Sequence, residues 1–206
     1  MLKGNNLSFR YGGDKPWILQ GISLEVAPGE VVGLSGPSGL GKTTLAKILA
    51  GYLPPHTGQV TVVGQPLPLN GYCPIQLIFQ HPELAMNPRW RIRQILSEGH
   101  FPSPELMASL SLEAGWLNRW PHELSGGELQ RVAVARALGP RTRYLIADEM
   151  TAMLDANTQA QIWQAVMAHA RQRQLGVLVI SHDAPLLERL CQRVASMAEL
   201  HVAFAT

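Results

Sequence analysis

Residues 36–43 read Gly-Pro-Ser-Gly-Leu-Gly-Lys-Thr, which matches the pattern G-x-x-x-x-G-K-[ST]. Glycines in this pattern let the backbone turn its amide groups inward around the phosphates of a nucleotide. Lys42 places a positive charge against the β- and γ-phosphates, and the Thr43 hydroxyl is suited to ligate the Mg²⁺ that bridges them. The pattern predicts a phosphate-binding loop (P-loop), whose binding residues are Gly36, Ser38, Gly39, Gly41, Lys42 and Thr43.

The segments on either side of this loop fit the same interpretation. Residues 30–34 form a short apolar run suited to a buried strand, and residues 44–50 favour a helix. Phosphates bound by the loop would then meet the amides at the start of that helix. A glycine-rich turn without a ligand is the alternative, and the two matching flanks argue against it.

Two acidic residues follow a second apolar run about a hundred residues later. Residues 144–147 predict a buried strand that ends in Asp148 and Glu149. Asp148 can hold Mg²⁺ through its water shell, and Glu149 can orient and polarise an attacking water. A solvated strand end is the alternative, but the preceding P-loop favours the catalytic interpretation. His182 follows the buried run 176–180 and is placed to bond a γ-phosphate.

Tyr11 closes an alternating run over residues 7–11. An aromatic side chain there could stack on an adenine ring, because stacking needs only a π-face. A half-buried strand tyrosine is an equally good interpretation from position alone.

Composition limits the class of protein. The chain has 206 residues, of which 46% are hydrophobic and 16% charged, and its net charge is +2. These values indicate one globular domain and give no electrostatic case for nucleic acid. The longest apolar runs are too short for a bilayer, and the first residues lack the apolar core of a signal peptide. We therefore expect a cytoplasmic protein, in which Cys73 and Cys191 are structural.

The order of elements predicts an α/β fold. Two alternating runs, 7–11 and 22–26, suggest antiparallel strands before the P-loop strand, and runs at 59–64 and 76–80 suggest two more. Residues 81–124 contain short helical pieces broken by proline, and helices are expected at 125–138 and 157–174. Strands alternating with helices around a P-loop indicate a mainly parallel sheet in a three-layer domain.

These motifs together resemble the nucleotide-binding subunits of ABC transporters. Residues 124–128, Leu-Ser-Gly-Gly-Glu, match the LSGGQ signature with Glu128 in its last place, between the P-loop and the acidic strand. The other family motifs follow in order: Tyr11 (A-loop), Gly36–Thr43 (Walker A), Gln80 (Q-loop), Tyr144–Asp148 (Walker B), Glu149 (catalytic base), Met153–Asp155 (D-loop) and His182 (switch histidine). The resemblance covers essentially the whole chain, and it favours adenine stacking for Tyr11.

The resemblance implies an ABC-type P-loop NTPase fold with a mixed, mainly parallel sheet, N-terminal antiparallel strands and a small inserted helical subdomain. It implies a RecA-like core over residues 1–80 and 125–206, with the helical subdomain at about 81–124. The catalytic residues would be Glu149 and His182, and Mg²⁺ would be held by Thr43, Gln80 and Asp148. The nucleotide would also contact Tyr11, Thr44, Gln80, Ser125, Gly126, Gly127 and Asp155.

The partners follow from the same resemblance. It implies a head-to-tail dimer, homo- or heteromeric, with two ATP molecules sandwiched between the P-loop of one subunit and the signature of the other. It further implies two permease subunits docked near the Q-loop, an extracytoplasmic binding protein that acts indirectly, and a peripheral location on the cytoplasmic face of the inner membrane.

Several short sequence segments, including residues 76–82, 86–89 and 120–124, indicate one branch of this family. They are similar to the oligopeptide, dipeptide and nickel importers, so we expect an ATPase that powers import of nickel, a metal chelate or peptides. A soluble ABC ATPase, a stand-alone exporter ATPase and a P-loop kinase are the alternatives.

Two departures from the family are notable. Glu128 lies beyond the phosphate-facing residues and should be tolerated, whereas Met150 replaces a usual proline and should loosen the turn.

Overall fold

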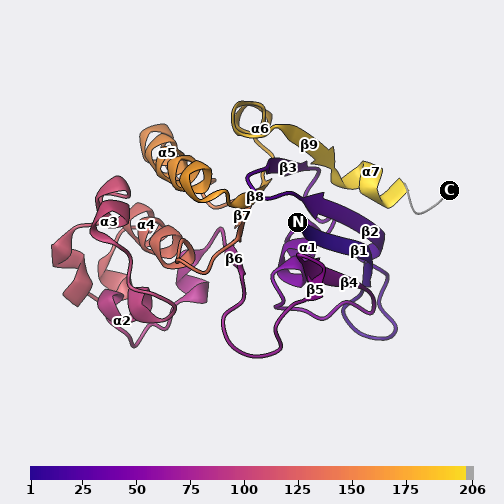
Figure 1. Cartoon of the computed structure of the whole chain (residues 1–206), viewed down its shortest axis with the longest axis horizontal. Coiled ribbons are helices and arrows are strands. Elements are labelled where there is room, and N and C mark those ends of the chain that lie inside the picture. The colour runs from indigo at the N-terminus through magenta and orange to yellow at the C-terminus, as the bar shows by residue number, and fades with distance from the viewer. Residues whose placement is uncertain (203–206) are drawn as a thin grey trace.

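The strands form two separate sheets (Figure 1). The computed structural model describes residues 1–202. The first sheet is antiparallel, with the order β2-β1-β4-β5, and its strands are β1 (Leu2–Phe9), β2 (Leu19–Val26), β4 (Thr57–Val62) and β5 (Gln65–Pro66). The prediction of an α/β P-loop fold with N-terminal antiparallel strands is confirmed, and these strands form a sheet of their own.

The second sheet is parallel throughout, with the order β6-β7-β8-β3-β9. Its strands are β3 (Val31–Ser35), β6 (Ile75–Ile78), β7 (Tyr144–Asp148), β8 (Gly176–Ile180) and β9 (Arg193–Ser196). Strand β9 was not foreseen from the sequence, because it is short and only partly buried. It pairs with β3 and runs directly into a helix at Met197.

Seven α-helices cover the described part of the chain: α1 (Lys42–Leu49), α2 (Ile92–Ser97), α3 (Pro104–Ser109), α4 (Gly126–Ala137), α5 (Ala156–Arg173), α6 (Ala184–Leu190) and α7 (Met197–Val202). Short 3₁₀ turns lie at Pro82–Ala85, Ala114–Asn118 and Pro121–Glu123. Among residues 1–202, no helix has the length and apolar character needed to cross a bilayer.

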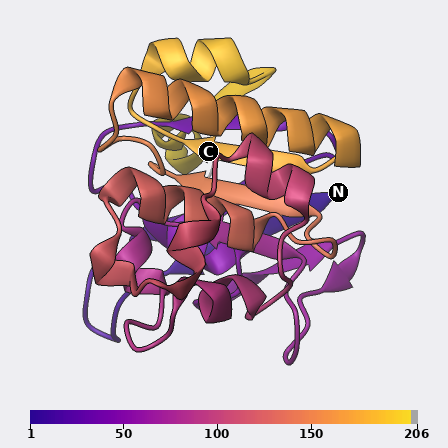
Figure 2. The ribbon, with the colours of Figure 1, turned by 90° about the vertical axis from the view of Figure 1, so that its left-hand side faces the viewer.

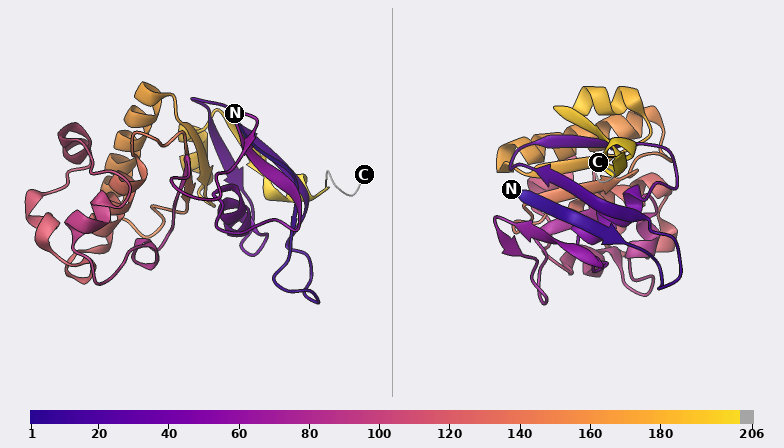
Figure 3. Two further views of the ribbon diagram at one scale, coloured as in Figure 1. Left: turned by 60° about the horizontal axis from the view of Figure 1, so that its bottom comes forward. Right: turned by 90° about the vertical axis from the view of Figure 1, so that its right-hand side faces the viewer.

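The parallel sheet separates two apolar cores, and side-chain alternation along each strand assigns residues to them. Along β8, Val177 and Val179 belong to the core that α4 and α5 cover, whereas Leu178 and Ile180 belong to the core that contains α1 and the antiparallel sheet. The three layers are visible in Figure 3, and Figure 2 shows the helical layer from its outer side. Burial on both faces explains why these strands are continuously apolar.

Residues 82–123 contain only helices, turns and loops. Their apolar side chains, among them Ile95, Leu106 and Trp116, share one core with α4 and α5. The division of the chain into a RecA-like core and a helical subdomain at about 81–124 stays a prediction, because this segment packs continuously with helices assigned to the other part.

Gly176 gives a test of this packing. A Cβ atom there would lie 2.5 Å from two ring carbons of Tyr144 and 2.7 Å from the carbonyl oxygen of Ala27. We expect Gly176→Ala to lower the free energy of unfolding by about 1–3 kcal/mol, as overpacked cores do. Urea unfolding followed by circular dichroism measures this. Gly115→Ala is the control, because nothing lies within 4 Å of its Cβ position. Equal losses in both variants would contradict the packing argument.

Candidate nucleotide site

The register of the parallel sheet gathers the predicted catalytic residues at one edge. Asp148 at the end of β7 is aligned with Ile180 at the end of β8, and Ile180 is aligned with Leu34 of β3. The P-loop, Glu149 and His182 each follow one of these strand ends. Parallel strands place their carboxyl ends at the same edge, which is where open α/β sheets bind ligands.

The P-loop connects β3 to α1. Gly41 has φ 89°, and a Cβ atom there would lie 2.8 Å from Cγ2 of Ile18, so both conformation and space require glycine. The Lys42 ammonium donates to the carbonyl oxygens of Gly36 at 2.7 Å and Pro37 at 2.9 Å. These contacts hold the cation inside the loop.

The start of α1 differs from the starts of α4, α5 and α6. No side chain caps it, whereas Ser125, Asp155 and Asp183 accept hydrogen bonds from the first turns of α4, α5 and α6. The first amides of a helix need acceptors and carry partial positive charge. The start of α1 therefore fits a phosphate group.

Asp148 is only 5% exposed, and burial raises the pKa of its carboxyl group. The hydrogen bond with Thr43 and the charge of Lys42 oppose this effect, while the nearby Glu149 adds to it. A cation between Asp148 and Thr43 would stabilise the ionised form. Residues 1–202 hold no group of three or more His, Cys, Asp or Glu side chains that could bind a metal. One carboxylate with a hydroxyl fits Mg²⁺, which keeps several waters.

Glu149 lies in a left-handed backbone conformation with φ 48°, which is uncommon for a residue other than glycine. Its backbone amide donates to the Ile180 carbonyl at 3.0 Å. Its carboxylate Oε1 lies 3.3 Å from Nδ1 of His182, whose side chain is 69% exposed. The two side chains line a small pocket of about 100 Å³. A carboxylate and an imidazole are thus held beside the end of β7.

Tyr11 lies over the start of α1. Its hydroxyl is 3.5 Å from Oγ1 of Thr44, and its ring meets Phe9 edge-on at 4.9 Å. Phe9 in turn contacts His56, and His56 contacts Trp17, both edge-on. Sequence reasoning missed this aromatic support, because it depends on His56, which joins Phe9 and Trp17 from a distant part of the chain.

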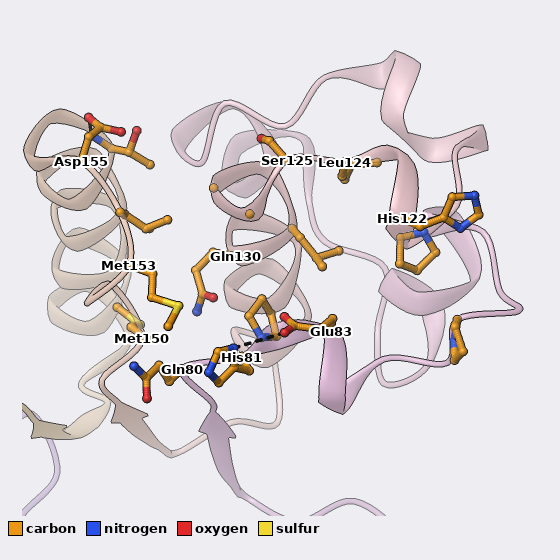
Figure 4. A pocket seen from close by; sticks show the side chains of 18 residues that line it. Gln80, His81, Glu83, His122, Leu124, Ser125, Gln130, Met150, Met153 and Asp155 are labelled. Carbon is orange, nitrogen blue, oxygen red and sulfur yellow. Dashed lines mark hydrogen bonds and ion pairs between the residues drawn. The ribbon is translucent and has the colours of Figure 1, made fainter. Parts of the chain in front are cut away.

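The remaining predicted residues line a separate pocket of about 840 Å³ (Figure 4). Its lining includes Gln80, Ser125, Gly126, Gly127 and Asp155, and no P-loop residue. Figure 1 shows α1 and α4 on opposite sides of the parallel strands. One chain therefore presents two incomplete groups, one around the P-loop and one around the start of α4.

Glu128 reaches back toward the signature instead of pointing beyond it. Its carboxylate accepts from the Ser125 amide at 2.6 Å, while the Ser125 hydroxyl accepts from the Glu128 amide at 3.3 Å. This capping box stabilises the start of α4. The hydrogen bond from Ser125 lowers the pKa of Glu128, which is therefore ionised at neutral pH. A negative charge thus lies at the Ser125 amide within the signature. The Ser-x-x-Glu spacing of residues 125–128 was the sequence signal that could have found it.

Met150 is 2% exposed and packs in the core beside α4 and α5. Two hydrogen bonds fix the turn that follows it. The Ala152 amide donates to the backbone carbonyl of Glu149, and the Trp163 indole donates to the Thr151 hydroxyl, each at 3.1 Å. The expected loosening of this turn relative to the family stays a prediction, and the buried methionine and these bonds are what would limit it.

The three-layer fold, the uncapped P-loop helix and the acidic strand end define an α/β P-loop nucleotide hydrolase. Comparisons with known proteins agree. The family described as ABC transporter matches residues 19–152. NikE, the nickel import ATP-binding protein of Escherichia coli strain K12, is 36% identical over 199 residues, which covers 87% of this chain and 74% of NikE. This chain belongs to the ABC transporter family as an ATP-binding subunit of the ATPase type.

Two further comparisons support the branch and the fold. The probable D,D-dipeptide transport ATP-binding protein DdpF of the same strain is 34% identical over 191 residues, or 87% of this chain and 60% of DdpF. The dimeric cassette MJ0796 has a TM-score of 0.80 at 25% identity and covers 95% of this chain and 94% of its own. The post-hydrolysis state of MJ0796 bound to ADP and Pi has a TM-score of 0.78, with the same coverage of both chains. The predicted family and its nickel and peptide importer branch are confirmed.

The burial of Asp148 predicts a gain in stability when its charge is removed. Because the folded pKa is raised, the folded chain holds its proton to higher pH than the unfolded chain, so stability falls as pH rises through that interval. We expect Asp148→Asn, without nucleotide or Mg²⁺, to be more stable than wild type by about 1 kcal/mol near pH 7. The difference should shrink as the pH falls through the raised pKa of Asp148, because the buried carboxyl is then protonated in the folded chain.

Denaturant unfolding across this pH range measures the difference. Asp14→Asn serves as the control, because Asp14 is exposed in a turn. A variant that is less stable than wild type at every pH would show that the ionised carboxylate of Asp148 is favourable to the fold.

The position of Glu128 predicts an effect on nucleotide-driven dimerisation. Glu128→Gln keeps the capping box but removes the negative charge beside Ser125, where the partner's nucleotide would place its phosphate. We expect ATP to promote dimer formation at about two- to fivefold lower concentration, measured by analytical ultracentrifugation. Glu123→Gln is a matched control, because Glu123 caps the Trp120 amide at 2.6 Å in the same way outside the signature. Equal shifts for both variants would contradict a local effect.

Proposed function

We propose that this chain is the ATP-hydrolysing subunit of an ABC importer for nickel, a metal chelate or peptides. The observation that carries the proposal is the division of the predicted site into two groups that one chain does not bring together. A head-to-tail pair would place the start of α4 of one subunit against the P-loop of the other. The dimeric state of MJ0796 supports this arrangement, and the nickel import and dipeptide transport roles of NikE and DdpF support the importer assignment.

Each group has a distinct proposed task. Tyr11 stacks on the adenine, while Gly36, Ser38, Gly39, Gly41 and Thr44 donate to the phosphates around Lys42. Thr43 and Asp148 would hold Mg²⁺ together with Gln80, which lines the signature pocket but follows β6, the strand paired with β7. The bound ion would neutralise phosphate charge. From the partner, the amides of Gly126 and Gly127 with Ser125 bind the γ-phosphate, and Asp155 of the D-loop lies beside them.

Glu149 is the proposed general base. Its carboxylate is 20% exposed and can accept a proton from the attacking water. His182, bonded to it, orients the carboxylate and can donate to the γ-phosphate as negative charge develops there. The left-handed backbone of Glu149 is a strained conformation of the kind found at functional sites.

A groove of about 580 Å³ supports the coupling to a permease. It lies between the end of α1, strand β6 and helix α4, and Tyr52, Tyr72, Phe79, Glu98 and Arg136 are among its lining residues. Tyr52 is 60% exposed and meets Phe79 edge-on at 5.6 Å. Because Phe79 directly precedes Gln80, an element docked here would be mechanically linked to the nucleotide site.

The proposed complex contains a second ABC ATPase subunit, identical or related, and two permease subunits. An extracytoplasmic binding protein would act through the permeases. The proposed location is therefore peripheral, on the cytoplasmic face of the membrane that holds the permeases. Cargo selection would belong to the permease and binding protein, because neither the groove nor the nucleotide site would contact the cargo.

Two substitutions separate binding from turnover. Glu149→Gln should keep ATP binding and lower kcat at least about a hundredfold, because the general base is lost. Lys42→Ala should instead weaken ATP binding, because it removes the cation inside the P-loop. Equilibrium binding of a fluorescent ATP analogue and phosphate release measure the two effects. Turnover by Glu149→Gln at the wild-type rate would exclude Glu149 as the base.

The importer assignment is tested by co-expression with the neighbouring permease and ATPase genes. ATP hydrolysis that rises in the purified membrane complex and disappears with Glu149→Gln would support it, and the co-purified binding protein would identify the cargo. ATP hydrolysis in solution with no association with a permease would favour a soluble ABC ATPase. Association with a permease that moves substrate outward would favour an exporter.

A further inference from the structure

We propose that three arginines at the edge of the parallel sheet opposite the nucleotide form a contact site for anionic phospholipid headgroups. Arg141 and Arg143 lie just before β7, and Arg173 ends α5. All three line one pocket of about 540 Å³. Arg141 and Arg143 also line an adjoining hollow of about 380 Å³ beside β5.

The arginines are held in place but are not neutralised. The Arg141 guanidinium stacks on the Tyr72 ring at 4.3 Å, and the Tyr72 hydroxyl bonds the Thr142 hydroxyl at 2.6 Å. Arg173 donates to the Pro140 carbonyl. None of the residues that line either hollow is acidic, and within residues 1–202 no carboxylate lies within 4.0 Å of these guanidinium groups. Planar guanidinium groups that are free to bond match phosphate oxygens well.

Exposed apolar side chains border the same site. Val63 lines the larger pocket and is 58% exposed, and Leu69 in the β5–β6 connection is 99% exposed. Figure 1 shows that connection looping away from both sheets. Pro66 and Pro68, from β5 and the same connection, line the smaller hollow. Arginines beside exposed apolar side chains suit the interface of an anionic bilayer, because the arginines can bind headgroup phosphates while the apolar side chains meet the acyl chains.

The location favours a membrane over a soluble anion. Tyr72 lines both the smaller hollow and the groove proposed for the permease. If a permease occupies that groove, the arginines lie next to the membrane protein. This orientation rests on the proposed function, but lipid binding by the isolated subunit does not.

Vesicle flotation of the purified full chain tests the site. The probes are vesicles of phosphatidylcholine alone and of equimolar phosphatidylcholine and phosphatidylglycerol. We expect binding only to the second kind, and weaker binding at higher ionic strength, because exposed charges are screened.

The test variant combines Arg141→Gln, Arg143→Gln and Arg173→Gln. An arginine near an anionic surface contributes about fivefold in affinity, so the triple variant should bind roughly a hundredfold more weakly. Leu69→Ser should weaken binding by a few-fold at most, as expected for one apolar tip. The matched control removes the same charge from exposed arginines elsewhere, at Arg89, Arg119 and Arg189.

Specific loss in the test variant, with thermal unfolding and ATP binding unchanged, supports the lipid site. Equal loss in the control would show a nonspecific effect of net charge and overturn the proposal. Absence of binding to the phosphatidylglycerol vesicles would also overturn the proposal. So would binding of a polyglutamate peptide at the three arginines, if the same chain does not bind the vesicles. Each of these outcomes leaves the proposed ATPase and permease roles untouched, because they are measured by turnover in the membrane complex.

Discussion

The alignment of three parallel strand ends is the constraint on which the rest of this structure depends. Asp148, Ile180 and Leu34 are in register across β7, β8 and β3, so the segments that follow them emerge side by side. This register is stable because both faces of the sheet are buried, one against α4 and α5 and the other against α1 and the antiparallel sheet. A shift of one residue would turn apolar side chains such as Val179 from one core to the other.

The groups at this edge are poorly suited to stabilising the fold. Asp148 is a buried carboxylate whose pKa is raised by burial, and Glu149 adopts a left-handed conformation beside it. Lys42 points its ammonium into backbone carbonyls, and the start of α1 lacks a capping side chain. A bound nucleotide with Mg²⁺ would satisfy these groups, so ligand binding and local stability are coupled here.

The division of the site has a physical consequence for the subunit. Helix α4, which begins with the signature residues Gly126 and Gly127, lies across the parallel strands from α1 (Figure 1), and the pocket at its start contains no P-loop residue. The same helix start carries the Glu128 carboxylate, which stabilises α4 as a cap but opposes an incoming phosphate. Assembly in the proposed dimer would therefore be tuned by this one side chain. The groove that Phe79 lines would then link such assembly to a permease in the proposed complex.

The sequence by itself determined the strands and helices that carry motifs, because apolar runs, glycines and caps are local signals. It also indicated the family, confirmed by the match over residues 19–152, and listed Tyr11, Lys42, Asp148, Glu149 and His182 as candidates. Only the tertiary structure decided which of them meet, the contact of His56 with the Phe9 ring beside Tyr11, and the arginine pocket. These features depend on contacts between residues far apart in the chain, which no periodicity or spacing records.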